Sequence, residues 1–409
     1  MHRIKSVRYL LLVALLLTAL SPVYAQDDDR ATVVVPAGGT IKIALVTDLT
    51  GPIAEMGLDI QQAAEIALME LNEAGGIQGF EVEYVVEDDR CSGDEGTLVA
   101  NRVAADEQIV AVLGHACSGA TIAASDVYEE ARIPMVSPSA TAALVTERGL
   151  DVVNRVAFRD DVQGTVDAHY LYKILGARRL AVLHDNDSYG LGLAEVVRDT
   201  FTELGGEVVA FEGINVDDQD YRPVLTPLAA NPPDAIFFGG YQEQAVLLVT
   251  QMRDVGLSDV IFFSDDGVYA DVFIEGAGAA AEGVYVSFVE EAEANAEANE
   301  AFDDKYEETF GVRPEQQGPF HAHSYDSAWI VFNALQEVAE LDDDGNLVID
   351  REALIEAIRN TEGYEGLTGT LSCDEIGDCG AGRIGINVVE DGEWVPVEVP
   401  EDLLEMEAE

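Results

Sequence analysis

The sequence predicts an α/β protein made of two lobes, each with a parallel sheet covered by helices. Short apolar segments such as residues 41–46 alternate with amphipathic segments of helical period from about residue 41 to residue 285. The apolar segments lack the polar alternation of half-exposed strands, which indicates parallel sheets buried on both faces. The chain has 409 residues, too many for one compact core, and two strand–helix series, 41–157 and 179–286, share one plan.

The N-terminal residues resemble a secretory signal peptide. Three basic side chains precede an apolar run at 9–20, and a small-residue motif predicts cleavage after Ala25. The run is shorter than the roughly 20 apolar residues that a membrane-spanning helix needs. We expect residues 1–25 to be removed on export and residues 26–39 to form a flexible lead-in. The mature protein would then be soluble and extracytoplasmic, either periplasmic or secreted.

The individual elements follow from apolar runs that end in Gly, Pro or Asp turns. The expected strands of the two series are 41–46, 81–86, 109–114, 133–136, 180–185, 235–240 and 260–265. Past residue 290 the pattern becomes helical, with helices expected up to residue 310, at 320–341 and at 352–360, and short strands near residue 371, at 384–389 and at 394–397.

Two loops after neighbouring strands carry small hydroxyl residues. The strand at 110–113 leads to Cys117 and Ser118 and then to an amphipathic helix, and the strand at 133–136 leads to a loop at 137–141. Open α/β sheets bind ligands at the carboxyl ends of their strands, and a helix N-terminus there favours an anion such as a carboxylate. The pattern predicts a site for a small polar molecule.

A series of short motifs resembles the periplasmic branched-chain amino-acid-binding proteins, the solute receptors of ABC importers, from about residue 40 to residue 397. None of these motifs is specific on its own, but their common order and spacing is specific to the family. Besides the segment from Ala111 to Thr141, the motifs are Leu49-Thr50-Gly51-Pro52, Asn72-Glu73-Ala74-Gly75-Gly76-Ile77, Asp88-Asp89-Arg90-Cys91, His184-Asp185-Asn186-Asp187-Ser188-Tyr189-Gly190, Gly239-Gly240-Tyr241 and Asp266-Gly267-Val268.

The resemblance implies a type I periplasmic binding protein fold, in which the chain crosses three times between two Rossmann-like lobes through a hinge. Lobe 1 would contain residues 40–159 and 289–371, and lobe 2 residues 160–288 and 372–409. The helices after residue 290 would thus return to lobe 1. Sequence periodicity alone does not indicate these crossings.

The resemblance also implies which first-lobe residues bind the ligand. Ser118 matches a serine that binds the ligand carboxylate, although a serine at a helix start can equally be an N-cap. Thr141 matches a threonine that contacts both ends of an α-amino-acid group. Ser139 matches the position that offers a carbonyl to the ammonium, and Ala140 completes this loop.

The second-lobe residues include a carboxylate and aromatic walls. Asp266 follows an apolar strand and would pair with the ligand ammonium, because an ammonium buried without an anion is costly. The family commonly has Glu there, and the neighbouring Asp265 could exchange roles with it. The remaining wall positions implied by the resemblance are Tyr189, Tyr241, Phe320 and Met56, the last replacing a large aromatic by an adaptable side chain.

Four cysteines suit an oxidising compartment. Cys91 and Cys117 follow adjacent predicted strands, so a bridge between them is plausible, and the resemblance implies the same pair. Cys373 and Cys379 flank a turn-like segment that a local disulfide would close. A zinc site is the alternative, but it lacks a C-x-x-C pair or matching histidines.

The net charge of −56 excludes some partners. Such a surface repels nucleic acid and anionic lipid. Acidic residues are spread over the whole chain, which suggests a solvation strategy for a saline habitat.

Metal and catalytic patterns are weak. His321 and His323 form an H-x-H pair without further ligands at matched spacing, so we expect no metal. Residues 342–346 resemble part of an EF-hand loop, but its twelfth position is Arg351, and a turn is expected instead. The motifs G-x-S-x-G, S-x-x-K, H-E-x-x-H and Walker A, and a G-x-G-x-x-G after a strand, are absent, so neither an enzyme nor a cofactor is expected.

The sequence therefore favours a monomeric extracytoplasmic receptor. It would capture a small aliphatic, branched-chain type L-amino acid between two lobes and deliver it to an ABC permease. The alternative keeps the fold and makes the protein a sensor for an amide, urea or an aromatic acid, because fold does not determine the ligand.

Overall fold

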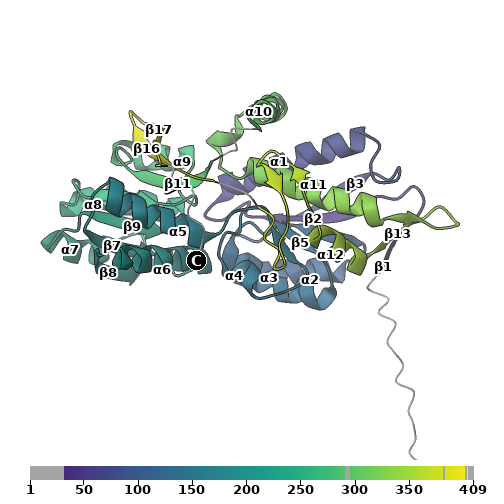
Figure 1. Cartoon of the computed structure of the whole chain (residues 1–409), viewed down its shortest axis with the longest axis horizontal. Helices are drawn as coiled ribbons and strands as arrows, with labels where there is room; N and C mark the ends of the chain where they lie inside the picture. The colour runs from purple at the N-terminus through teal and green to yellow at the C-terminus, as the bar shows by residue number, and fades with distance from the viewer. Residues whose placement is uncertain (1–31, 291–294, 381–382, 401–402, 404–409) are drawn as a thin grey trace, which may run out of the picture.

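The computed structural model describes residues 32–290, 295–380, 383–400 and 403, which form two α/β lobes side by side (Figure 1). Residues 1–25, assigned above to a signal peptide, lie outside the described residues. Both lobes have mainly parallel sheets with helices on their faces. The predicted fold class is confirmed.

The first lobe contains a five-stranded parallel sheet in the order β3-β2-β4-β5-β6. Its strands are β2 (Ile41–Thr47), β3 (Val82–Asp88), β4 (Ile109–Leu113), β5 (Met135–Ser137) and β6 (Val153–Arg155). Its helices include α1 (Ala54–Glu73), α2 (Gly93–Ala105), α3 (Ser118–Ala131) and α4 (Leu144–Glu147). Alternate residues of β2 enter two different cores: Ile43 and Leu45 pack toward α1, and Ala44 and Val46 pack toward α2 and α3. Apolar residues on both faces of the strand thus explain its unbroken apolar sequence.

The second lobe contains a seven-stranded sheet in the order β17-β16-β11-β10-β9-β7-β8. The strands are β7 (Arg179–His184), β8 (Glu207–Gly213), β9 (Ala235–Gly239), β10 (Ile261–Ser264), β11 (Tyr285–Glu290), β16 (Arg383–Glu390) and β17 (Glu393–Val397). Its helices are α5 (Asp160–His169), a π-helix at Tyr170–Ile174, α6 (Ser188–Glu203), α7 (Arg222–Ala230), α8 (Gln242–Val255) and α9 (Asp271–Ala277), followed by a 3-10 turn at Gly278–Ala280. The first five strands along the chain are parallel, and β16 and β17 add to the β11 edge in antiparallel orientation.

After β11 the chain returns to the first lobe. The returning elements are α10 (Ala296–Phe310), a 3-10 turn at Pro314–Gln316, α11 (His321–Val338), β12 (Glu340–Leu341), β13 (Leu347–Asp350), α12 (Arg351–Arg359), β14 (Tyr364–Glu365) and β15 (Thr370–Leu371). Helix α11 packs against α1 and the first-lobe sheet, and Figure 1 shows it beside α1. The chain then enters β16, so it passes between the lobes three times.

Two expectations about local structure were wrong. The lead-in is not flexible throughout, because Thr32–Val35 forms β1 and pairs antiparallel with β13. Val33 and Val35 point into the core, and their burial stabilises this strand. The helix expected at 320–341 ends at Val338, and β12 follows it. Residues 342–346 form the turn between β12 and β13, in which Asp342 accepts hydrogen bonds from the backbone N–H groups of Asp344 and Asn346.

The predicted return to lobe 2 at residue 372 comes too early. Cys379 is buried in the first-lobe core. Its backbone N–H donates to the Arg155 carbonyl at 2.9 Å, and the Arg155 N–H donates to the Gly377 carbonyl at 2.9 Å. Residues 372–380 therefore extend the edge of the first-lobe sheet beside β6, and β15 also belongs there, because it pairs with β14 and Leu371 is in the same core.

Both expected disulfides are present. Cys91 pairs with Cys117, which joins the loops after β3 and β4. Cys373 pairs with Cys379 and closes the segment that packs beside β6.

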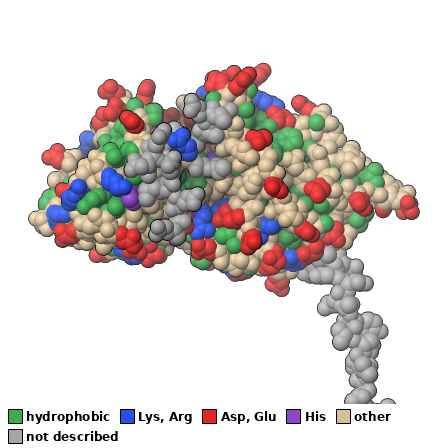
Figure 2. Space-filling model, viewed as in Figure 1, with side chains coloured by type: hydrophobic (Ala, Val, Ile, Leu, Met, Phe, Trp, Pro, Cys, Tyr) green, Lys and Arg blue, Asp and Glu red, His purple; other side chains and the backbone are tan. Residues whose placement is uncertain are grey.

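Asp and Glu side chains are spread over both lobes on the face shown in Figure 2. None of the helices in the described part of the chain is long and apolar enough to cross a membrane.

Candidate ligand-binding site

A small cavity lies between the lobes, at the carboxyl ends of the first-lobe strands. Seven of its lining residues were predicted from the sequence: Met56, Ser118, Ser139, Tyr189, Tyr241, Asp266 and Phe320. Four others also line it: Ile53, Ala116, Cys117 and Gly267. The walls leave about 10 Å³ for the centre of a water-sized sphere, enough for about one water. An amino acid therefore requires the lobes to part.

The first-lobe wall is a pair of loops held together by hydroxyl groups. Ser137 Oγ donates to the His115 carbonyl at 2.6 Å, and Ser139 Oγ donates to the Ala116 carbonyl at 2.9 Å. Ser118 Oγ accepts from the Ala142 N–H at 3.1 Å. The loops after β4 and β5 lie together because these strands are neighbours in the sheet.

Ser118 is the first residue of α3 and not its N-cap. Cys117 occupies the cap position in extended conformation and makes no side-chain cap hydrogen bond. The first N–H groups of a helix have no partner within the helix, and its dipole favours an anion at this end. The N-terminus of α3, with the hydroxyl groups of Ser118 and Ser139 beside it, therefore suits a carboxylate.

Ala140 and Thr141 lie behind this wall and are not among the lining residues. Arg155 fixes their backbone. One of its terminal nitrogens, Nη1, donates to the carbonyls of Ala140, Thr141 and Ala142 at 3.1, 2.7 and 2.9 Å. Its Nε donates to Asp378 at 2.5 Å. A fully buried guanidinium thus holds the loop from below, with its counter-charge on the segment closed by the second disulfide.

Asp266 is the carboxylate of the second-lobe wall. It is 3% exposed, and its Oδ1 accepts hydrogen bonds from Gln163 Nε2 at 2.8 Å and from the Tyr189 hydroxyl at 2.9 Å. Burial raises the pKa of Asp266 to about 6, although these two hydrogen bonds act in the opposite direction. A cation in the cavity would stabilise its charged form.

Asp265 does not share this position. Its side chain accepts hydrogen bonds from the N–H groups of Gly240 and Gly267, both at 3.1 Å, and it does not line the cavity. Asp265 therefore holds together the loops after β9 and β10. Burial, with the nearby charge of Asp266, raises the pKa of Asp265 well above its ordinary value.

Two further buried carboxyls lie under Asp266. Burial is the main cause that raises the pKa values of Asp160 and Asp167 well above their ordinary range, and the negative charge of Asp266 adds to it. Ser287 links the group, because its hydroxyl donates to Asp167 at 3.0 Å and accepts from Gln163 at 2.9 Å. The site thus gathers three carboxyl groups, and burial with their mutual repulsion favours the neutral form of Asp160 and Asp167.

The remaining walls are apolar. Tyr189 and Tyr241 stack with ring centroids 5.3 Å apart, and both are nearly fully buried. Phe320 and Met56 close the cavity from the first-lobe side, at 1% and 2% exposure. These surfaces suit an aliphatic side chain.

The sequence argument missed Gln163, Asp160, Asp167 and Arg155. Gln163 and the two acids belong to α5, the first helix after a crossing between the lobes. No local motif connects them with residues 266 and 287. The one available signal was the position of Gln163 and Asp160 directly after the predicted hinge.

The described residues contain no group of three or more His, Cys, Asp or Glu side chains arranged to hold a metal ion. His321 Nδ1 lies 3.5 Å from a carboxylate oxygen of Asp59, and the two residues tie α11 to α1.

Comparisons with known proteins identify the family of the chain. A family model described as periplasmic binding protein matches residues 40–376. A leucine-, isoleucine-, valine-, threonine- and alanine-binding protein from Pseudomonas aeruginosa is 34% identical over 347 residues, which cover 84% of this chain and 88% of the relative.

Two solved structures are similar to this chain. The leucine-binding protein LivK from Thermotoga maritima has a TM-score of 0.79 and 31% identity, covering 89% of this chain and 100% of the other. The substrate-binding protein LivJ from Streptococcus pneumoniae, in complex with isoleucine, has a TM-score of 0.76 and 29% identity, covering 88% and 100%. By sequence and by fold, the chain belongs to the periplasmic binding protein family.

Proposed function

We propose that the protein binds a small aliphatic L-amino acid between its lobes and delivers it to an ABC permease. One observation carries the proposal: a helix N-terminus with serine hydroxyls faces a buried carboxylate across a cavity with apolar walls. This arrangement complements the carboxylate, the ammonium and the side chain of an α-amino acid.

The roles follow from position. Ser118 and the α3 N-terminus would bind the ligand carboxylate, and Asp266 would pair with the ammonium. Ser139 would offer its carbonyl to the ammonium, and Thr141 would support both ends from behind the wall. The names of the relatives, which bind leucine, isoleucine, valine, threonine or alanine, support this ligand class.

The proposed setting is outside the cytoplasm. Export would remove residues 1–25, and the mature protein would act as a monomer that captures its ligand without catalysis. Family membership supports this setting. A permease would accept the closed, loaded form.

Isothermal calorimetry on refolded, ligand-stripped protein tests the proposal. Leucine, isoleucine, valine and alanine are the ligands, and leucinamide and N-acetyl-leucine are matched controls that lack one charge each. We expect at least one amino acid to bind and both controls to bind at least roughly tenfold more weakly, because each leaves one buried group of the site unpaired. Binding of an amide, urea or an aromatic acid, with no heat from any amino acid, would instead support the sensor function.

A further inference from the structure

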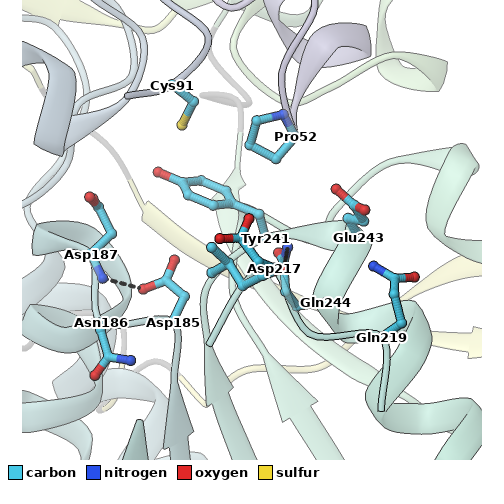
Figure 3. A pocket seen from close by; sticks show the side chains of 11 residues that line it. Pro52, Cys91, Asp185, Asn186, Asp187, Asp217, Gln219, Tyr241, Glu243 and Gln244 are labelled. Atoms are coloured by element: carbon cyan, nitrogen blue, oxygen red, sulfur yellow. Dashed lines mark hydrogen bonds between the residues drawn. The ribbon is translucent and has the colours of Figure 1, made fainter. Parts of the chain in front are cut away.

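The mouth of the cleft contains a second and larger hollow, here called the outer hollow (Figure 3). Its volume is about 470 Å³, and Pro52 and Cys91 from the first lobe face second-lobe residues across it. Tyr241 lines both the outer hollow and the inner cavity, so its side chain separates the two spaces. The proposed amino-acid site accounts for the inner cavity and leaves the outer hollow without a role.

The outer hollow is lined by hydrogen-bond acceptors with negative charge. Four acidic side chains line it, from Asp185, Asp187, Asp217 and Glu243, and its lining contains no Lys or Arg. Burial raises the pKa of Asp185 to about 7 and that of Asp187 above its ordinary value, so most of the negative charge comes from the exposed pair Asp217 and Glu243. None of these carboxylates forms a salt bridge with a cationic side chain among the described residues. The hollow therefore attracts cations.

Gln244 gives an independent sign of a ligand. It is 3% exposed, and its Oε1 is buried without a hydrogen-bond partner. Its Nε2 donates to the Val216 carbonyl at 3.4 Å, so the amide oxygen is the free acceptor at the floor of the hollow, beside Asp217 in Figure 3. A buried acceptor without a donor is costly, and a ligand N–H would satisfy it.

The spacing of the acids distinguishes among cations. No three His, Cys, Asp or Glu side chains in the described part of the chain converge as metal ligands, so these acids do not form a site for a single metal ion. A larger cation with several N–H groups can reach separate carboxylates and the Gln244 oxygen together. The ring of Tyr241 offers such a cation an aromatic surface.

We propose that the outer hollow binds an organic cation with N–H donors, a guanidinium or primary ammonium group. The cation is either a free molecule or the side chain of a basic amino acid whose backbone groups occupy the inner cavity. The second case rests on the proposed amino-acid site and changes its ligand from an aliphatic to a basic amino acid, whereas the first case does not depend on that site.

Calorimetry with agmatine tests the proposal, because agmatine has a guanidinium and an ammonium but no carboxylate. The purified mature protein is titrated with and without saturating leucine. We expect one agmatine per chain in both cases, and at least tenfold weaker binding of tetramethylammonium, which has no N–H donor. Equal binding of the two cations overturns the proposal, whereas leucine binding is measured separately and reports on the proposed function.

Paired variants separate a site from general attraction to an acidic surface. The double substitution Asp217→Asn with Glu243→Gln removes two charges from the hollow, and Asp343→Asn with Asp344→Asn removes two from the exposed β12–β13 turn. We expect the first pair to weaken agmatine binding at least fivefold and to leave leucine affinity unchanged. We expect the same result from Gln244→Met alone. The control pair should change agmatine affinity less than twofold. Equal effects of both pairs would mean nonspecific binding and would overturn the proposal.

L-Arginine distinguishes the two sources of the cation. If arginine displaces leucine, and the hollow variants weaken arginine but not leucine, the basic group belongs to an amino-acid ligand. If agmatine binds beside leucine and arginine does not displace leucine, the cation is a separate molecule. If neither agmatine nor arginine binds, the hollow is not a cation site.

Discussion

Asp266 is a buried residue whose charged form is disfavoured by burial. Its carboxylate lies at the cavity wall with two hydrogen-bond donors, Gln163 and Tyr189, and with acidic neighbours beneath it. A ligand ammonium would supply the positive charge that this wall lacks.

We expect Asp266→Asn to weaken amino-acid binding by roughly 2–5 kcal/mol, because the ammonium is then buried without a counter-charge. The free energy of unfolding at pH 7 should not fall, because burial already disfavours the ionised carboxylate there. Calorimetry and urea denaturation measure the two quantities, and Asp259→Asn, in an exposed turn, is the control. Unchanged affinity in Asp266→Asn would show that another group pairs with the ammonium.

We expect Asp265→Asn to affect stability more than ligand binding, the opposite of Asp266→Asn. Asp265 bridges two backbone N–H groups of neighbouring loops and does not reach the cavity. We expect a loss of about 1–3 kcal/mol in the free energy of unfolding, because the amide replaces one of its two acceptor oxygens by a donor. Ligand affinity of the folded fraction should fall less than in Asp266→Asn. This corrects the view that Asp265 could exchange roles with Asp266.

Ligand affinity should depend on pH through Asp266. Its pKa of about 6 lies above the ordinary value of 3.8, so the carboxyl becomes neutral as pH falls below about 6. Affinity should be constant above pH 7 and should approach a tenfold loss per pH unit below 6. The unliganded protein has the reverse trend from this group: the stability it contributes is complete below about 3.8 and is lost as pH rises through about 6. The ligand-induced rise in Tm should therefore grow between pH 5 and pH 7, and Asp266→Asn should flatten it.

At the scale of elements, the segment closed by the second disulfide supports the ligand loop. Asp378 pairs with Arg155, and Arg155 holds three consecutive carbonyls of the loop after β5. Although burial alone would raise the pKa of Asp378, Arg155 and Arg159 hold it below its ordinary value. The segment thus acts on the site through a guanidinium that never reaches the ligand.

We expect Asp378→Asn to lower the free energy of unfolding by roughly 3–5 kcal/mol, because a buried guanidinium loses its main counter-charge. Ligand affinity should also fall, since the carbonyls around Thr141 are less firmly held. Glu375→Gln, at an exposed position of the same disulfide-closed segment, is the control for removing a charge from the turn. If both variants behave alike, the Arg155 contact is not what stabilises the loop.

At the scale of the whole molecule, the two lobes meet in a closed arrangement. Tyr189 and Tyr241 of one lobe share a hydrophobic cluster with Met56 and Phe320 of the other. Asp187 at the start of α6 accepts a hydrogen bond from the Gly119 N–H at the start of α3, and this contact leaves no room for a Cβ at residue 119. Closure therefore has its own contacts apart from the ligand.

Small-angle scattering should show a smaller radius of gyration with ligand than without it, because a ligand that contacts both lobes favours the closed state. Asp187→Ala should enlarge the radius of the ligand-free protein, and Asp199→Ala, on the exposed face of α6, should not. Identical radii in all four states would mean that the cleft does not open in solution.

The acidic surface should make stability depend on salt. The chain has 78 Asp and Glu residues against 22 Lys and Arg residues. Repulsion among them is screened over about 10 Å at 0.1 M salt and about 3 Å at 1 M. We expect Tm to rise steadily from 0.1 to 2 M NaCl, and scanning calorimetry measures it. A flat or falling Tm would show that the native state already compensates its charge.

The sequence by itself determined the lobed α/β plan, the loops that carry Ser118 and Ser139, and the neighbourhood of Asp266. Strand periodicity, turn residues and motifs are patterns over short distances along the chain, so these features can be predicted from local sequence. Both disulfides were also predicted from the positions of their cysteines.

Only the tertiary structure decided how these parts are supported. Arg155 and Asp378 are 223 residues apart, and Gln163 and Asp266 are 103 apart. No periodicity relates residues so distant, and their pairing depends on where the chain crosses between lobes. The same crossings keep residues 372–380 with the first lobe and place Gln244 under the cleft mouth. Long-range packing, which no local pattern encodes, determined the charge and the rigidity of the site.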